Sequence, residues 1–143
     1  MSIETLLERY PADVATLRLL ESTLLDHEDI IIHSSKGGSG ERVQTSGTSD
    51  ITADKAIQLV ELREIMVKRE HDLTARIKAV ESGLDLLTDV ELQAITLRYF
   101  EYRGVYEVSD IMGLSIRSIH RYLSSAKLKI KDCVKEFMVH DRA

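Results

Sequence analysis

The sequence predicts an all-α protein with a long helix, a C-terminal helix-turn-helix and an N-terminal helical segment. Three observations lead to this fold class. Apolar residues recur at intervals of three and four along most of the chain, which is the spacing of one helix face. Glu, Lys, Leu, Ile and Ala are abundant, whereas Pro occurs once and Trp is absent among the 143 residues. The hydrophobic content of 43% supports a core, and the charged content of 30% suits a soluble chain.

Residues 1–33 are predicted to form the N-terminal helical segment. Residues 2–10 fit one short helix. Pro11 fits the first position of a second helix, because its missing N–H has no partner there anyway. The second helix is expected to run to His27, on the helically spaced apolar residues Val14, Leu17, Leu20, Leu24 and Leu25.

Residues 34–50, SSKGGSGERVQTSGTSD, are predicted to be a flexible linker. The segment contains four Gly, five Ser and two Thr, with one isolated Val. Such a composition buries too little apolar surface to offset the entropy lost on ordering. A phosphate-binding loop is not indicated, because the Gly-Lys-Ser/Thr order is absent.

Residues 51–84 are predicted to form one long, coiled-coil-like helix that ends at Gly83 with a left-handed cap. Its apolar seam consists of Leu59, Leu62, Met66, Leu73, Ile77, Val80 and Leu84. Two interpretations stay open and are compatible: a hairpin with the helix ending at His27, or a dimeric coiled coil. At about 1.5 Å per residue, the long helix should span about 46 Å, whereas the helix that ends at His27 should span about 25 Å. The part of the apolar seam that the shorter helix cannot cover predicts a homodimer through the long helix.

Residues 85–143 are predicted to form the helix-turn-helix domain. Thr88 and Glu91 match a capping box, so a helix should start at Asp89 and run to about Glu101. After Gly104, residues 105–112 fit a short helix. A turn at residues 113–115 should then lead, through a Ser cap, into a last helix that runs from position 116 to about position 137.

The last helix carries an unusual charge pattern. The whole chain has a net charge of −5, yet residues 113–131 contain five Lys or Arg and no Asp or Glu. Local charge decides binding, because surface charges are screened within about 8 Å at physiological salt. The predicted core side of this unit consists of Ile111, Ile119, Leu123 and Ala126, and the opposite side of Arg117, His120, Arg121 and Ser124. This arrangement indicates a helix that enters the major groove of DNA.

Two stretches resemble region 4 of bacterial sigma-70-type factors. They are LTDVELQAITLRYFE and VSDIMGLSIRSIHRYLSSAKLKI. With the long charged helix in front, the chain is similar to the sigma-like phage regulators of the RinA and ArpU type. The resemblance covers roughly residues 52–131 and implies a regulator of late phage or prophage genes that acts with the host RNA polymerase.

The resemblance also implies which residues contact DNA. The base-reading positions of region 4 fall on Ile116, Arg117, His120 and Arg121, and the capping position falls on Ser115. Ile116 stands where sigma factors usually carry a polar or basic residue, so the usual −35 sequence is not expected. No segment resembles the region that melts the −10 element, so a complete sigma factor is not expected either. The full set of expected DNA-binding residues is Ser115, Ile116, Arg117, Ser118, His120, Arg121, Ser124 and Lys127.

The expected function is therefore sequence-specific transcription regulation on double-stranded DNA. Two alternatives remain, a DNA-packaging protein like a small terminase subunit and an adaptor that binds polymerase without DNA. No enzyme, cofactor or metal site is expected, because the five His residues are scattered and no catalytic constellation is found. A single Cys, no long apolar run and no signal-peptide layout predict a cytoplasmic protein of the bacterial host cell, without a membrane partner.

Overall fold

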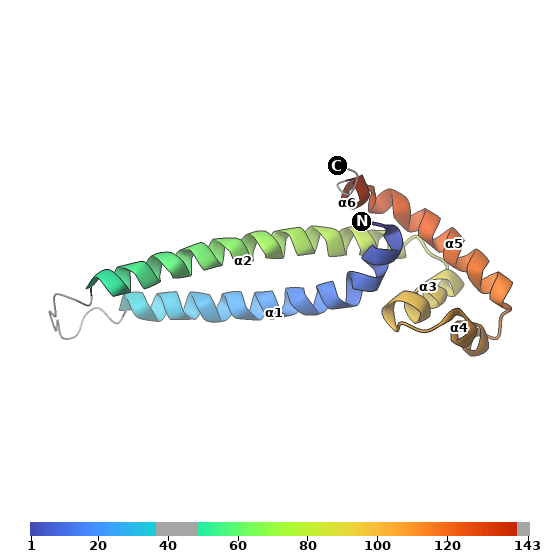
Figure 1. The fold of residues 1–143 in the computed structure, drawn as a ribbon, viewed down its shortest axis with the longest axis horizontal. Coiled ribbons are helices and arrows are strands. Elements are labelled where there is room, and N and C mark those ends of the chain that lie inside the picture. Colours follow the sequence, from blue (N-terminus) through green and yellow to red (C-terminus); the bar gives the residue numbers. More distant parts are fainter. Residues whose placement is uncertain (37–48, 140–143) are drawn as a thin grey trace. The chain divides into compact units, whose positions relative to one another are not determined.

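The computed structural model describes residues 1–36 and 49–139, and every regular element in these ranges is helical (Figure 1). The fold class predicted from the sequence is confirmed as all-α. The chain divides into two compact units. The first unit combines residues 1–15 with the chain from Thr74 onward, and the second consists of residues 16–73.

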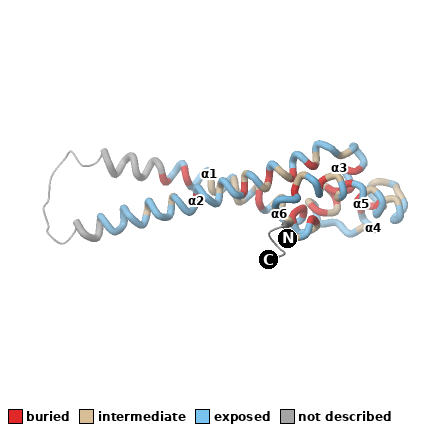
Figure 2. The backbone as a smooth tube through the Cα atoms, turned by 90° about the horizontal axis from the view of Figure 1, so that it is seen from above, coloured by how far each residue is buried: buried red, intermediate tan, exposed pale blue. Residues whose placement is uncertain are grey.

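The second unit is a helical hairpin. It contains most of α1 (Ile3–Lys36) and most of α2 (Ser49–Leu84), which run side by side in opposite directions (Figures 1 and 2). Among the side chains of this unit that the structure describes, Leu24 and His27 of α1 and Met66 and Leu73 of α2 are buried. The intramolecular hairpin expected from the apolar seam is therefore present.

The predicted length of the first helix is wrong. Instead of two helices separated at Pro11 and ending at His27, α1 is continuous over 34 residues, against 36 for α2. At about 1.5 Å per residue the two helices are about 51 and 54 Å long. The length mismatch on which the predicted dimer depended therefore does not exist, and the dimer itself stays a prediction.

Pro11 lies inside α1 rather than at a helix start. An interior Pro removes one backbone hydrogen bond and costs about 3 kcal/mol. Packing on both sides offsets this cost. Leu6 and Leu7 precede it and are 1% and 0% exposed, and Asp13 follows it in an ion pair of 2.9 Å with Arg76 of α2.

The predicted linker falls mostly outside the described residues. Its first three residues, 34–36, belong to α1, and its last two, 49 and 50, belong to α2. These five positions continue the neighbouring helices, because Ser, Lys and Asp are tolerated in a final or first helical turn.

The first unit is built around α5 (Ile116–Cys133), with α3 (Asp89–Ile95), the π-helix η2 (Thr96–Phe100), α4 (Val105–Met112) and α6 (Lys135–Val139). Figure 2 shows buried positions concentrated among these short helices. The core contains Ile3, Leu6, Leu7, Val80, Ala94, Ile95, Val108, Ile119, Leu123, Ala126, Ile130 and Val134. Both α1 and α2 thus contribute side chains to the core of the helix-turn-helix unit.

Gly83 has a packing role and not the predicted capping role. It is buried inside α2, and a Cβ atom at this position would lie 2.8 Å from Cγ2 and 3.0 Å from Cα of Ile130. Ile130 is fully buried in α5. Only Gly allows α2 and α5 to approach this closely, so the residue is set by a contact between distant segments and not by a turn.

The helix after the capping box ends differently from the prediction. Thr88 and Glu91 form the expected capping box. The predicted α-helix to Glu101 instead changes to a π-helix at Thr96, and the N–H of Glu101 donates to the carbonyl of Thr96 over 2.9 Å. Tyr102 then takes a left-handed conformation with φ of 57°, and its hydroxyl donates to the carbonyl of Glu8 over 2.8 Å.

The helices α4 and α5 and the turn between them agree closely with the sequence prediction. The bounds of α4 and the start of α5 are as predicted, and Gly113 has the expected left-handed φ of 66°. Ile111 is an exception, because it is 48% exposed and Val108 fills the core in its place. The predicted last helix is interrupted at the fully buried Val134, after which α6 begins.

Candidate nucleic-acid interface

The start of α5 is fixed by short-range hydrogen bonds. Ser115 caps the helix, and its hydroxyl accepts from the N–H of Ser118 over 3.2 Å. The hydroxyls of the same two residues are 2.9 Å apart and share a hydrogen bond. Across the turn, the Ser109 hydroxyl donates to the carbonyl of Leu114. The orientation of α5 on α4 is therefore held by side chains of the turn as well as by the core.

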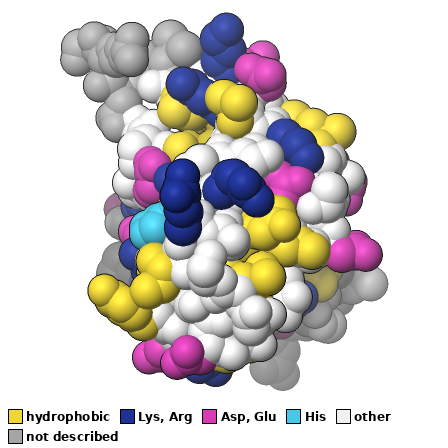
Figure 3. All heavy atoms as spheres, turned by 90° about the vertical axis from the view of Figure 1, so that its right-hand side faces the viewer, with side chains coloured by type: hydrophobic (Ala, Val, Ile, Leu, Met, Phe, Trp, Pro, Cys, Tyr) yellow, Lys and Arg dark blue, Asp and Glu magenta, His cyan; other side chains and the backbone are white. Residues whose placement is uncertain are grey.

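α5 has one buried face and one exposed face. Ile119, Leu123, Ala126 and Ile130 are between 0% and 4% exposed. The opposite face carries the exposed residues Arg117, His120, Arg121 and Ser124, in which positions 117 and 121 and positions 120 and 124 are four apart. Figure 3 shows basic side chains and a histidine close together on this end of the protein, with hydrophobic side chains beside them.

The three predicted contact residues at the helix start differ in accessibility. Ile116 is 37% exposed, an unusual position for a branched apolar side chain at the first turn of a surface helix. Ser115 is exposed, but its hydroxyl is used by the cap, and Ser118 is half-buried. Ser115 and Ser118 thus hold the helix start, and their side chains have less freedom to contact a ligand than Arg117 or Arg121.

Lys127, one of the expected DNA contacts, forms an ion pair within the first unit, and its expected role in DNA binding stays a prediction. Its amine lies 3.2 Å from the Glu4 carboxylate of α1. Burial, the largest influence, would lower the pKa of Lys127, but the hydrogen bond to Glu4 and the interactions with Tyr99 and the Glu4 charge outweigh it and raise that pKa. The pKa of Glu4 is lowered, mainly by a backbone hydrogen bond and also by Lys127. The positive charge of Lys127 is therefore balanced within the first unit.

Lys129 is paired as well. Its amine lies 2.6 Å from the carboxylate of Glu91, whose side chain is 4% exposed. Two of the five cations in the acid-free stretch of sequence thus have acidic partners from α1 and α3. The exposed cationic face is narrower than the sequence suggests and is centred on Arg117 and Arg121.

Two exposed residues outside the expected DNA-binding set also lie on this face. Leu128 and Lys131 continue the spacing of Arg121 and Ser124 along α5, and both are exposed. Leu128 is 69% exposed. Helical intervals of three and four residues place both on this face. The sequence alone does not show which of the three closely spaced lysines are exposed there.

Other candidate chemistry is sparse in the described part of the chain. Residues 1–36 and 49–139 hold no cluster of three or more His, Cys, Asp or Glu side chains able to bind a metal ion. None of the helices in these ranges combines the length and apolar character needed to cross a membrane. The Arg98 side chain of η2 donates to the carbonyl of Arg103 over 3.2 Å, and its Cζ lies 5.7 Å from the centroid of the Tyr99 ring.

Comparisons with protein-family models, with curated proteins and with solved structures find no match to this chain. The assignment of a function therefore depends on the geometry of α4 and α5 and on the resemblance noted in the sequence.

Proposed function

We propose that the protein binds double-stranded DNA through α5 and regulates transcription. The observation that carries the proposal is the exposed face of α5. Arg117, His120 and Arg121 lie on it, and within the described residues their side chains form no hydrogen bond or ion pair. In a helix-turn-helix, the N-terminal half of the second helix is the part that meets base edges in the major groove.

The side chains of this face suit DNA recognition. An Arg side chain can donate two hydrogen bonds to O6 and N7 of guanine, and a His or Ser side chain can donate to phosphate or to base acceptors. Ile116 adds an apolar surface of the kind that contacts a thymine methyl group. The combination favours sequence-specific binding over a purely electrostatic attachment, because the chain as a whole is acidic.

The regulatory role follows from the resemblance to sigma region 4 and to the RinA and ArpU type of phage regulator. We propose that the protein activates late phage or prophage genes together with the host RNA polymerase. A DNA-packaging protein or a polymerase adaptor remains the alternative. Footprinting on promoter DNA from the same genome separates them, because a regulator protects a site upstream of a late gene whereas an adaptor protects nothing on its own.

Replacing either arginine should weaken specific binding. Arg117→Ala or Arg121→Ala is expected to cost about 1–3 kcal/mol of binding free energy, the loss of one bidentate base contact. The binding site can be selected from random duplex DNA and the affinities measured by fluorescence anisotropy. Arg9→Ala, which removes an exposed arginine on α1, is the matched control and should bind as the wild type does. Equal affinity of all four proteins would place the DNA contact elsewhere.

The two lysines Lys127 and Lys131 should behave differently. Lys131→Ala is expected to weaken binding to all sequences and to lower the salt slope of the binding constant by about one. Lys127→Ala should instead lower the free energy of unfolding by about 1 kcal/mol, because it removes the pair with Glu4. Urea denaturation and a salt titration of DNA binding measure the two effects, and a reversed pattern would mean that Lys127 leaves Glu4 to contact phosphate.

A further inference from the structure

The part of α2 in the second unit has an exposed apolar face distinct from the one packed on α1. Positions 57, 60, 64, 67 and 71 follow one another at intervals of three and four, so they share one side of the helix. Ile57, Val60 and Val67 are 56%, 51% and 47% exposed. The buried Met66 and Leu73 lie on another side of α2. We call positions 57, 60, 64, 67 and 71 the outer face.

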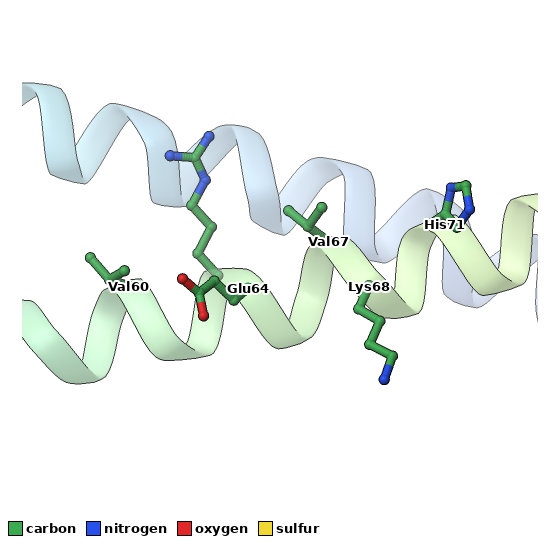
Figure 4. Close-up of a pocket in the computed structure, with 6 residues that line it drawn as sticks. Val60, Glu64, Val67, Lys68 and His71 are labelled. Carbon is green, nitrogen blue, oxygen red and sulfur yellow. The ribbon is translucent and has the colours of Figure 1, made fainter.

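The outer face is hollowed along the helix. A groove of about 760 Å³ is lined by Val60, Arg63, Glu64, Val67, Lys68 and His71. Figure 4 shows Val60, Val67 and His71 projecting from the same side of α2, whereas Lys68 is directed away from them. A row of half-exposed branched side chains beside a groove is a surface that gains free energy when an apolar partner removes it from water.

We propose that the outer face binds the outer face of a second copy of the chain, so that the two α2 helices pack antiparallel about a two-fold axis. Alternating intervals of three and four residues are the pattern that two supercoiled helices need for knobs-into-holes packing. In the antiparallel register centred between positions 65 and 66, Val67 packs on Glu64 of the second copy and Val60 packs on His71. An isologous contact of this kind closes on itself and gives a dimer.

The charges beside the outer face select the antiparallel direction. In that register Glu61 and Lys68 of the second copy are diagonal neighbours on the same flank of the interface, and the two-fold axis repeats the pair. Both side chains are exposed, and each flanks the apolar positions at the place where coiled-coil helices form interhelical ion pairs. A parallel pair would instead bring Glu64 against Glu64, so that two carboxylates oppose each other at the centre.

This dimer differs from the one that the sequence predicted. In the predicted seam, Met66 and Leu73 are buried within the chain, whereas Leu62 is 49% exposed, and the outer face consists of other residues. The outer face was not noticed in the sequence, because Glu64 and His71 interrupt its apolar residues. The dimer is also independent of DNA binding, since all its residues belong to the second unit and the DNA contacts belong to the first.

Sedimentation equilibrium of the full chain at micromolar concentration tests the proposal. The wild type should be a dimer, and Val60→Asp/Val67→Asp should raise the dissociation constant by about tenfold or more. Ile65→Asp is the matched control, because Ile65 is 65% exposed on a different side of the same helix, and it should leave the dimer intact. A monomeric wild type, or equal effects of the two changes, would overturn the proposal.

Two sets of variants test whether the two α2 helices pack antiparallel: an exchange of the charges at positions 61 and 68, and a cysteine at position 57. Glu61→Lys should weaken the dimer, and Glu61→Lys/Lys68→Glu should restore it. In a Cys133→Ser background, Ile57→Cys should form no disulfide between copies, because antiparallel packing separates the two positions by about 25 Å. Fast oxidation of Ile57→Cys to a disulfide-linked dimer would show that the helices pack parallel. If Glu61→Lys/Lys68→Glu does not restore association, the ion pairs between Glu61 and Lys68 do not form.

Discussion

Gly83→Leu is expected to lower the free energy of unfolding by more than about 3 kcal/mol, and Gly83→Ala by about 1–3 kcal/mol. Even a single added Cβ atom would lie 2.8 Å from Cγ2 of Ile130 and 3.0 Å from its Cα. The nearest atoms belong to a fully buried residue and include backbone, so α2 and α5 have to separate to accommodate the new side chain. An isolated helix would gain about 0.5–1 kcal/mol from Gly→Ala, so a net loss isolates the effect of the contact.

Gly104→Ala is the control for this prediction. A Cβ atom at Gly104 would have no neighbour within 4 Å, and its φ of −68° is open to any residue. Urea denaturation followed by circular dichroism should therefore show little change for Gly104→Ala. The double variant Gly83→Ala/Ile130→Ala should lose less stability than the two single changes added together, because the smaller partner relieves the clash. Strict additivity would show that the two residues do not compete for space.

Local rules predicted the helix-turn-helix well, because its signals act over a few residues. The capping box at Thr88, the left-handed turn at Gly113 and the cap at Ser115 each depend on neighbours within four or five positions. The same rules failed at Pro11 and Gly83. There the backbone state is decided by packing between distant segments, which composition and spacing do not reveal.

In the candidate interface, too, local signals were readable from the sequence and contacts between distant residues were not. The exposed face that contains Arg117, His120 and Arg121 follows from helical spacing opposite a regular apolar pattern. The pairing of Lys127 with Glu4 joins residues 123 positions apart, and that of Lys129 with Glu91 joins residues 38 positions apart. A stretch without acids in the sequence can thus be neutralised by acids from other helices, and only the fold shows which cations remain available.

Lys129→Met should cost about 1–3 kcal/mol of stability at neutral pH, because the buried Glu91 carboxylate loses its cation, although the Lys129 side chain itself is 38% exposed. Glu91 is 3% exposed, and its carboxylate accepts hydrogen bonds from the Lys129 amine over 2.6 Å and from the Thr88 hydroxyl over 3.0 Å. Without Lys129 the buried carboxylate keeps its desolvation cost and loses its cation. Lys131→Met is the matched control, since Lys131 is exposed on the same helix and the change should alter stability by less than about 0.5 kcal/mol.

The cost of Lys129→Met should depend on pH in a defined direction. Burial, the largest influence, would raise the pKa of Glu91, but the hydrogen bonds from Lys129 and Thr88 outweigh it and lower that pKa below the ordinary value. A lowered folded-state pKa stabilises the protein above the pKa of the unfolded chain, about 4.3, and this stability disappears as the pH falls through the folded-state value. The difference between wild type and Lys129→Met should therefore be full at pH 7 and shrink below about pH 4, where the carboxyl becomes protonated and no longer needs the cation. Urea denaturation at pH 7, 5 and 3 measures it, and a difference that stays constant over this range would assign the loss to the aliphatic packing of Lys129 and not to its charge.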